Sequence, residues 1–445
     1  MAFDGDLGRS LTTTGGTIMS FMEETQAAIA PARLVRGDET WAQVMNDVAE
    51  WAFGGRPHDP RMPPTWGVDF SRVYGVEVDE PGGPVLAAVS SAWSFDIPVP
   101  GGRVPAGGLT WVSVRPGYRR RGFLRAMIAA HFQDCAERGE PMSMLCAAEL
   151  PLYGRFGYGV ASQSVSVRIP SGAALRPIPA ADAVHVHFDT ATFADHDALV
   201  QDVRKQAGRS RAARPGWTEL VTIGAREQRL TNTDTHLRET ERLRVAVARR
   251  DGRPTGFALF RRDGKVQANM TESVTAVEEF VATDPASAHA LWQSLIGMDL
   301  TAAVTVDNEP LDGWLFSLLL NWRAAKPLVC DAIHTRLIDL PAALAARRYA
   351  APVDLVLEVT DPLLPTNTGT WRLHGNRDHA EVTAAPGARP DIVGDIAAFS
   401  AAYLGGTGLA VLEDAGQIRE TTPDALELLD TALHSYRAPA LATDF

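Results

Sequence analysis

From about residue 32 onward, short apolar runs alternate with amphipathic stretches, a pattern typical of a mixed α/β chain. The first part of this pattern predicts a helix, a two-strand hairpin, a strand, a second helix and another strand. Their residues are 41–53, 73–78 with 85–90, 109–114, 122–137 and 142–147. In the second helix, apolar side chains recur at helical spacing on one face, and Gly139 is placed to end it.

The same order of elements recurs further along the chain, at a domain-sized interval. A hairpin, a strand, a helix and a strand are expected at 243–248 with 256–260, 273–282, 285–296 and 301–306. Because the helix starts equally sharply in both copies, we interpret the second copy as a duplicated fold. The alternative is that any α/β protein contains this order of elements.

A third unit begins near Ile333 and has an α+β arrangement. Its first helix starts in DLPAALAARRY, with Asp339 as the N-cap and Pro341 in the first turn. Apolar residues then alternate over 353–359, which predicts a half-buried strand. Further strands and helices are expected at 370–373, 381–383, 394–404 and 423–433. We therefore divide the chain into a flexible N-terminal tail and three domains, at residues 1–31, 32–165, 166–332 and 333–445.

Composition narrows the class of protein. With 445 residues the chain is too long for one ordinary domain, and 45% hydrophobic with 22% charged residues is typical of a globular protein. The net charge of −12 argues against nucleic-acid binding and mildly favours cationic partners. Three scattered cysteines have neither disulfide nor zinc spacing, so we expect no metal and a reducing cytoplasm. Neither a membrane-spanning apolar run nor signal-peptide features are found, so we expect no membrane association.

The strongest candidate for chemistry lies where the strand at 109–114 meets the following helix. Arg119, Arg120 and Arg121 stand in a short loop, and Gly122 directly precedes the helix. A helix N-terminus carries free backbone N–H groups and the positive end of the helix dipole, so this loop predicts a phosphate-bearing ligand. The second copy has ATDPASAHALW at this place, and we expect it to lack the phosphate site.

The loop and three other motifs resemble the GNAT acetyltransferases, and among them the enhanced intracellular survival (Eis) family. The GNAT pattern Arg/Gln-x-x-Gly-x-Gly/Ala is similar to RRRGFL at 119–124, where the final leucine departs from the general pattern but is usual for Eis-like members. The block YGRFGYG at Tyr153–Gly159, the LPAALAARRY segment and the terminal phenylalanine also match. The resemblance covers roughly residues 32–445. It implies tandem GNAT folds, the second inactive, followed by a domain similar to sterol carrier protein type 2.

The resemblance also implies an activity and its co-substrate. We expect a homohexamer that uses acetyl-CoA to acetylate primary amines, notably those of aminoglycosides and lysine side chains. Arg120 and Arg121 would hold the CoA pyrophosphate, and the backbone of the strand before the loop would pair with pantetheine. The expected cofactor-binding residues are Val112, Ser113, Val114, Arg120, Arg121, Gly122, Phe123, Leu124, Arg125, Ala148 and Glu149.

The expected reacting groups are a tyrosine and the C-terminus of the chain itself. Tyr153 matches the family's general acid, because a phenol with a pKa of about 10 is protonated at neutral pH and can protonate the leaving thiolate. The alternative is that Tyr153 only packs against Phe156 and Tyr158. By the family's pattern, the α-carboxylate of Phe445 folds back as the general base, whereas a frayed terminus is the ordinary alternative. By position in the family, Trp111 would wall the acceptor pocket and Asp444 would bind a second ammonium group.

Two other functions stay open at this point. The third domain could be the functional part, as a lipid-binding module with Phe399, Tyr403 and Leu404 along an apolar tunnel; the retained arginine loop argues against it. The protein could also sense acetyl-CoA without turning it over. The presence of Tyr153 and the terminal phenylalanine weighs against a sensor.

Overall fold

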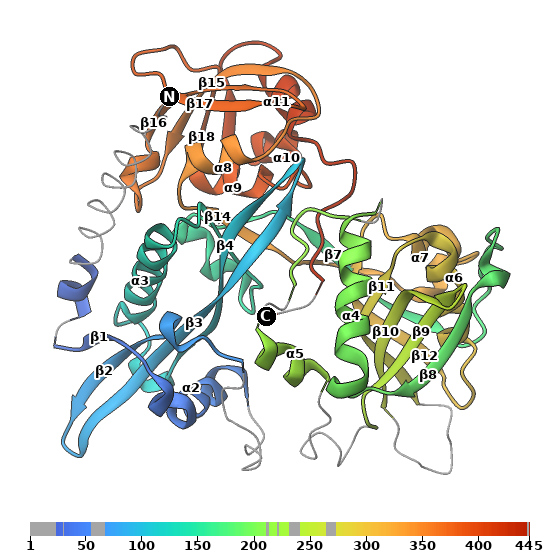
Figure 1. The fold of residues 1–445 in the computed structure, drawn as a ribbon. Helices are drawn as coiled ribbons and strands as arrows, with labels where there is room; N and C mark the ends of the chain where they lie inside the picture. The colour runs from blue at the N-terminus through green and yellow to red at the C-terminus, as the bar shows by residue number, and fades with distance from the viewer. Residues whose placement is uncertain are drawn as a thin grey trace, which may run out of the picture.

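The computed structural model describes residues 24–29, 31–54, 67–210, 213–219, 222–230, 241–263, 273–442 and 445. Three β-sheets, each with its own helices, make a multi-domain α/β protein, as predicted (Figure 1). Most of the predicted N-terminal tail lies outside the described residues, while residues 24–29 form a helix.

The first sheet has seven strands, and its one parallel pair lies near the centre. The order is β1 (Arg33–Arg36), β2 (Tyr74–Glu80), β3 (Gly83–Val99), β4 (Gly102–Val114), β5 (Met142–Leu145), β14 (His334–Leu337) and β6 (Gly159–Val160). All neighbours run antiparallel except β4 and β5. The β4 side chains Val112 and Val114 pack toward helix α3 (Phe123–Glu137), whereas Trp111 packs toward helix α2 (Ala42–Phe53).

Strands β3 and β4 are longer than predicted. The strands were expected to end at residue 90 and to begin at residue 109, but β3 and β4 pair from Ala88↔Val114 to Val99↔Gly102. Residues 86–93 of β3 are continuously buried, so the alternation that marks a half-buried strand is missing there. The extension packs against the third domain in one shared core, which includes Phe95 and Ile97 of β3 and Leu344 and Tyr349 of the third domain.

The second sheet repeats the topology of the first. Its order is β8 (His185–Thr190), β9 (Arg244–Arg250), β10 (Arg253–Asp263), β11 (Val274–Ala282), β12 (Ala303–Pro310), β7 (Gln163–Pro170) and β13 (Leu328–Asp331). Again one central pair, β11 and β12, is parallel, and the others are antiparallel. Helix α6 (Pro285–Ile296) occupies the place of α3 and has the predicted bounds. Helices α4 (Phe193–Gly208) and α5 (Ile223–Leu230) were not predicted.

The two sheets exchange one strand. Strand β7 follows β6 in the chain but pairs between β12 and β13 in the second sheet. Strand β14 follows the second sheet but pairs between β5 and β6 in the first. The sequence division placed His334–Leu337 in the third unit; the structure places these residues in the first sheet. A four-residue strand has no pattern that reveals which sheet it joins.

The third sheet is smaller, with the order β17 (Ala380–Ala384), β16 (Gly369–Gly375), β15 (Val353–Thr360), β18 (Ile392–Asp395) and β19 (Ile418–Glu420). Helices α8 (Leu340–Ala346), α9 (Ile396–Ala402), α10 (Leu409–Asp414) and α11 (Ala425–Leu433) accompany it. Asp339 caps α8 as predicted, because its carboxylate accepts the Ala342 N–H at 3.0 Å. The three residues considered for a lipid tunnel, Phe399, Tyr403 and Leu404, are buried in the core shared with the first domain.

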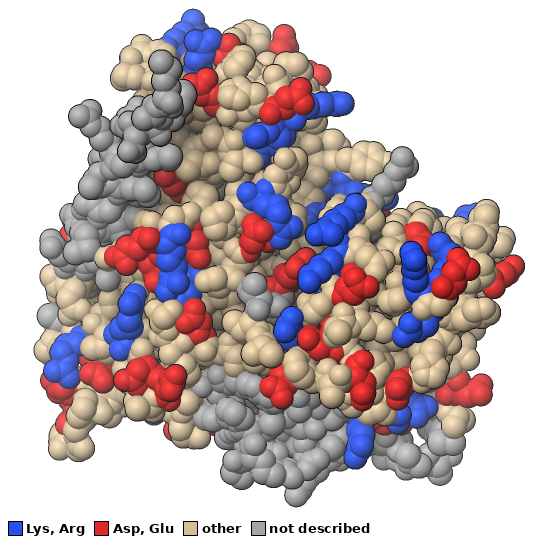
Figure 2. Space-filling view, in the orientation of Figure 1, with Lys and Arg blue, Asp and Glu red and all other residues tan. Residues whose placement is uncertain are grey.

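The surface mixes both signs of charge. Figure 2 shows basic and acidic side chains interspersed over one face of the molecule. Within the described residues, no helix combines the length and the apolar character that crossing a bilayer requires.

Candidate active site

A cavity of about 1220 Å³ opens in the first domain where strands β4 and β5 separate. The parallel pairing of these strands covers three residues of each, Ala106–Gly108 with Met142–Met144, and then stops. Beyond this point β4 is irregular, since its register with β3 shifts and Trp111 has φ of 57°, in the left-handed region. The two separated strand ends line the cavity, through Leu109–Val112 on one side and Ala148 and Glu149 on the other.

The arginine loop and the first turn of α3 form one end of this cavity. Arg120 has φ of 64° and Gly122 has φ of 81°, so the loop turns sharply before the helix. Gly122 is the N-cap of α3 and provides no side-chain cap. Gly122 through Arg125 line the cavity, so the uncapped N-terminus of a 15-residue helix faces it. This arrangement suits an anion, as the sequence predicted.

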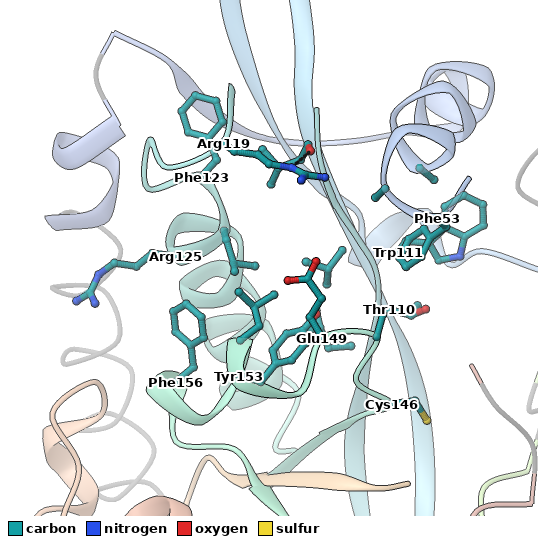
Figure 3. Close-up of a pocket in the computed structure, with 18 of the residues that line it drawn as sticks. Phe53, Thr110, Trp111, Arg119, Phe123, Arg125, Cys146, Glu149, Tyr153 and Phe156 are labelled. Atoms are coloured by element: carbon teal, nitrogen blue, oxygen red, sulfur yellow. Dashed lines mark hydrogen bonds between the residues drawn. The ribbon is translucent and has the colours of Figure 1, made fainter. Parts of the chain in front are cut away.

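The three arginines of the loop have different orientations. Arg119 and Arg120 line the cavity. Arg121 turns back on its own loop, where its guanidinium donates to the Gly117 carbonyl at 3.1 Å and lies 5.1 Å from the centre of the Tyr118 ring. Arg119 was not among the predicted cofactor residues, but it is better placed than Arg121 to contact a ligand in the cavity. Figure 3 shows Arg119 above the cavity.

Tyr153 lies on the opposite wall, between two short 3₁₀ turns (Leu150–Leu152 and Gly154–Phe156). Its side chain is almost fully buried, and burial, together with the negative charge of Glu149, raises the pKa of the phenol to about 12. Figure 3 shows the Glu149 carboxylate directed into the cavity beside Tyr153. The phenol therefore stays protonated over the whole physiological range.

The neighbouring Tyr158 has a structural role instead. Its hydroxyl is buried and shares a hydrogen bond of 2.8 Å with Ser143 Oγ, which in turn contacts His131 Nε2 at 2.7 Å. The Tyr153 and Tyr158 rings meet edge to face, with centroids 5.9 Å apart. Of the three aromatic residues that the sequence could not tell apart, Tyr153 and Phe156 line the cavity.

A buried arginine from β14 supports the tyrosine segment. Arg336 donates to the Phe156 carbonyl at 2.8 Å and makes a two-pronged ion pair with Asp361 at 2.8 and 2.7 Å. Its guanidinium lies 5.2 Å from the centre of the Phe132 ring of α3. The exchanged strand and the third domain thus hold the segment that carries Tyr153.

The C-terminal residue also reaches this cavity. Phe445 lines it, and its ring packs edge-on against Phe95 with centroids 4.8 Å apart. A Cβ at residue 108 would lie 2.8 Å from the Phe445 ring and 2.2 Å from the Phe95 ring, so the glycine there leaves room for both. Figure 1 shows the chain ending between the first sheet and helix α5. Asp444 lies outside the described residues.

Most of the other predicted residues line the cavity as well. They are Val112, Val114, Phe123, Leu124, Arg125, Ala148, Glu149 and Trp111. Ser113 is not among the lining residues. Its side chain is buried, and its Oγ has no hydrogen-bond partner among the described residues. The part of the chain that the structure describes contains no cluster of three His, Cys, Asp or Glu side chains suited to a metal ion.

Helices α2 and α5 line the cavity with residues that the sequence did not predict. Helix α2 contributes Asn46, Glu50 and Phe53, and helix α5 of the second domain contributes Gln228. Figure 3 shows Phe53 beside Trp111 on the side of α2. An aromatic residue at the exposed end of a helix was a usable signal for Phe53. Gln228 had no signal, because it comes from another domain.

Comparison with known proteins identifies the class. Residues 36–161 and residues 224–337 each match a family described as an acetyltransferase (GNAT) domain. Residues 340–442 match the sterol carrier protein domain. The two sheets of like topology are thus two GNAT domains, and the protein is an acetyltransferase.

Relatives define the family more narrowly. An uncharacterised N-acetyltransferase of Streptomyces avermitilis is 36% identical over 82% of this chain and 88% of its own length. The N-acetyltransferase Eis of Mycobacterium tuberculosis is 31% identical over 81% of this chain and 86% of its own. The crystal structure of Eis1 from Mycobacterium abscessus superimposes with a TM-score of 0.75 at 27% identity, covering 93% of this chain and all of that one. The chain belongs to the Eis-like family of GNAT N-acetyltransferases.

Proposed function

We propose that the protein transfers an acetyl group directly from acetyl-CoA to a primary amine, with Tyr153 as general acid and the terminal carboxylate as general base. One observation carries this proposal. A buried tyrosine, an uncapped helix N-terminus with two arginines, and the last residue of the chain all line one cavity.

The donor fits at the arginine end. Arg119, Arg120 and the free N–H groups of the first turn of α3 would hold the pyrophosphate. The separated backbone of Val112–Val114 would offer its polar groups to pantetheine, as a strand does to a partner. The thioester would then reach the middle of the cavity, between Tyr153 and Phe445.

The reaction needs two proton transfers. The amine nitrogen attacks the acetyl carbonyl, its C–N bond forms while the C–S bond breaks, and CoA leaves as a thiolate. The excess proton on nitrogen passes to the carboxylate of Phe445, and the thiolate takes a proton from Tyr153. Because its pKa is about 12, Tyr153 holds that proton at neutral pH until the thiolate leaves. Water then returns a proton to the Tyr153 phenolate and takes up the proton held by the terminal carboxyl group, so both groups are regenerated.

The acceptor is proposed from the lining of the cavity. Glu50 and Glu149 would attract ammonium groups, while Trp111 and Phe53 would contact the carbon framework. The width of the site favours aminoglycoside-like polyamines and lysine side chains. We extend the resemblance in the same way to a cytoplasmic homohexamer with no nucleic-acid partner.

The direct test measures free thiol. Purified protein is mixed with acetyl-CoA and a panel of aminoglycosides and lysine peptides. We expect thiol release that depends on the amine, and no release with any amine in the panel would overturn the proposal.

The Glu149 carboxylate competes with the terminal carboxylate for the role of base, and variants separate the two. Deleting Phe445, or adding residues after it, should lower kcat strongly while the dissociation constant for acetyl-CoA stays nearly unchanged. The matched variant is Glu149→Gln, which removes the competing carboxylate, leaves the terminal carboxylate intact and should retain most of kcat. If the Glu149 variant loses kcat and the deletion does not, Glu149 is the base.

A further inference from the structure

The second domain contains a cavity that corresponds in the fold to the active site. Strands β11 and β12 pair in parallel from Val274–Val277 with Ala303–Val306 and then separate, as β4 and β5 do. A cavity of about 330 Å³ lies where they part. Leu441 and Ala442, close to the C-terminus, also line it.

This cavity does not suit a phosphate. The N-terminus of α6 is capped by Asp284, whose carboxylate accepts the Ser287 N–H at 2.9 Å and pairs with Arg250 at 3.0 Å. Pro285 occupies the first turn and has no N–H to donate. The negative charge of the cap stands where a phosphate would need a donor.

Aromatic side chains form much of its wall. Trp217 and Trp314 line it, and Phe280 lies stacked on Trp292 with ring centroids 4.3 Å apart. The buried Trp217 Nε1 has no hydrogen-bond partner within the described ranges. The faces of such rings attract organic cations, and most strongly those of tryptophan.

A buried carboxylate accompanies the aromatic wall. Glu309 is 7% exposed, and its carboxylate lies against Gly313. The guanidinium of Arg214, which acts on Glu309 through its charge, is engaged with Asp312 and with the Ala438 carbonyl. Burial raises the pKa of Glu309 to about 7, although Arg214 and the Leu315 N–H act in the opposite direction. Within the described residues Glu309 makes no ion pair, so a cation would relieve its buried charge.

The other charged groups at the cavity leave this acidic character in place. Glu278 and Glu279 of β11 face Arg229 of α5, which pairs with both. Arg204 supplies a second guanidinium to Glu279. Asp307 of β12 also lines the cavity.

We propose that this second cavity binds a small organic ammonium ion, with the cationic group against Glu309 and its carbon substituents against the tryptophans. The site is separate from the acetyl-transfer centre and does not depend on the activity proposed for it.

The ligand would also contact the C-terminal segment of the chain, through Leu441 and Ala442. Arg214 donates to the Ala438 carbonyl at 3.0 Å, and the Ala440 N–H donates to the Pro215 carbonyl at 3.0 Å. The next described residues, Leu441 and Ala442, border the second cavity, and Phe445 lies in the first. Binding in the second cavity should therefore restrain the segment that ends in the active site.

The test uses choline as the probe and its neutral isostere 3,3-dimethyl-1-butanol as the control. Calorimetric titration of the full chain should show choline binding at least about tenfold more tightly than the alcohol. The Glu309→Gln variant should lose about that factor. Choline should also slow amide hydrogen exchange over residues 437–442. Equal binding of choline and the alcohol, or no choline binding at millimolar concentration, would overturn the proposal.

Two further variants locate the site. Trp314→Leu changes no charge and should weaken choline binding about threefold or more, because a cation–π contact is lost. This variant tests the proposal even if the Glu309 variant fails to fold. Glu50→Gln changes an acid of the first cavity and should leave choline affinity unchanged. If Glu50→Gln removes binding and the second-cavity variants do not, choline binds in the first cavity and the proposal is wrong. These are binding measurements, so they are independent of thiol release.

Discussion

The two GNAT domains share a topology but differ at the start of one helix. In the first domain, α3 begins at Gly122, which provides no side-chain cap, and its first turn opens into the large cavity. In the second, α6 begins with Asp284 as N-cap and Pro285 in the first turn. The same frame thus presents free N–H groups in one copy and a capped end in the other.

This difference shows how few residues decide whether a domain can bind a phosphate. An N-cap satisfies a backbone donor and stabilises the helix by about 1 kcal/mol, but it removes the donors that an anion would use. The first domain leaves those donors unused by its own side chains. In the second domain, the residues at the corresponding position stabilise helix α6 and leave no site for an anion.

The cavities that follow the two helices differ in the same direction. The first holds about 1220 Å³ and combines arginines with Tyr153 and Phe445. The second holds about 330 Å³ and combines tryptophans with Glu309. The C-terminal segment lines both cavities, through Leu441 and Ala442 in the second and Phe445 in the first. The two sites are therefore connected by one short segment of the chain.

The largest expected effect separates Tyr153 from its neighbour Tyr158 in the first domain. Tyr153→Phe should lower kcat by roughly 10² to 10⁴, because the leaving thiolate loses its proton donor. The pH profile of kcat should show no decline through pH 9, since the pKa of Tyr153 is about 12. Both are measured by thiol release.

Tyr158→Phe is the matched control for this prediction. It removes the hydrogen bond with Ser143 and should cost about 1 kcal/mol of stability while kcat changes much less. Equal losses of kcat in the two variants would make Tyr153 a packing residue.

The next effect concerns the buried acid of the second domain. The pKa of Glu309 is raised by burial from 4.5 to about 7, so the folded protein holds this proton more tightly than the unfolded chain. The free energy of unfolding therefore carries a penalty that is absent below pH 4.5 and complete above pH 7, up to about 3 kcal/mol. Glu309→Gln should remove it, making the variant more stable than the parent at pH 8 in urea titrations.

The exposed Glu50 in the first cavity provides the control, because Glu50→Gln removes a carboxylate that is not buried and should not make the protein more stable than the parent at pH 8. A Glu309 variant whose stability follows the parent at every pH would show that Glu309 is not held in its protonated form.

The loop arginines should differ in a smaller but measurable way. Arg120→Ala should raise KM for acetyl-CoA about 10- to 100-fold, since a charge-assisted bond to phosphate is lost. Arg121→Ala should raise it less, because that guanidinium is turned toward Gly117 and Tyr118. Steady-state kinetics at saturating amine measures both. The reverse order would mean that the loop rearranges when the donor binds.

Local patterns were enough to predict much of this comparison. The bounds of α6, the cap at Asp339 and the loss of the arginine loop in the second copy all follow from residues close together in the chain. Tyr153 was singled out by resemblance, and only the folded molecule shows that it lines the cavity while Tyr158 does not.

What could not be predicted depends on contacts between distant segments. The exchange of β7 and β14 cannot be predicted from these strands, because the pattern of a strand shows which side chains share a face and not which sheet it joins. The far end of the β3–β4 hairpin packs against the third domain, a contact between segments far apart in the sequence. Gln228 reaches the first cavity from the second domain, and its position follows from the packing of whole domains.

The smallest effect tests the cap itself. Asp284→Ala should destabilise the protein by about 1 kcal/mol, because the Ser287 N–H loses its acceptor. Burial opposes ionisation of Asp284, but the Ser287 N–H and Arg250 outweigh it and lower its pKa, so this stabilisation is present above about pH 3.8 and fades as the pH falls further. Thermal unfolding at pH 7 and pH 3 measures both. Because the second domain also lacks the arginines, the variant should still bind no acetyl-CoA there; a second equivalent of bound acetyl-CoA would mean that the cap alone had closed the site.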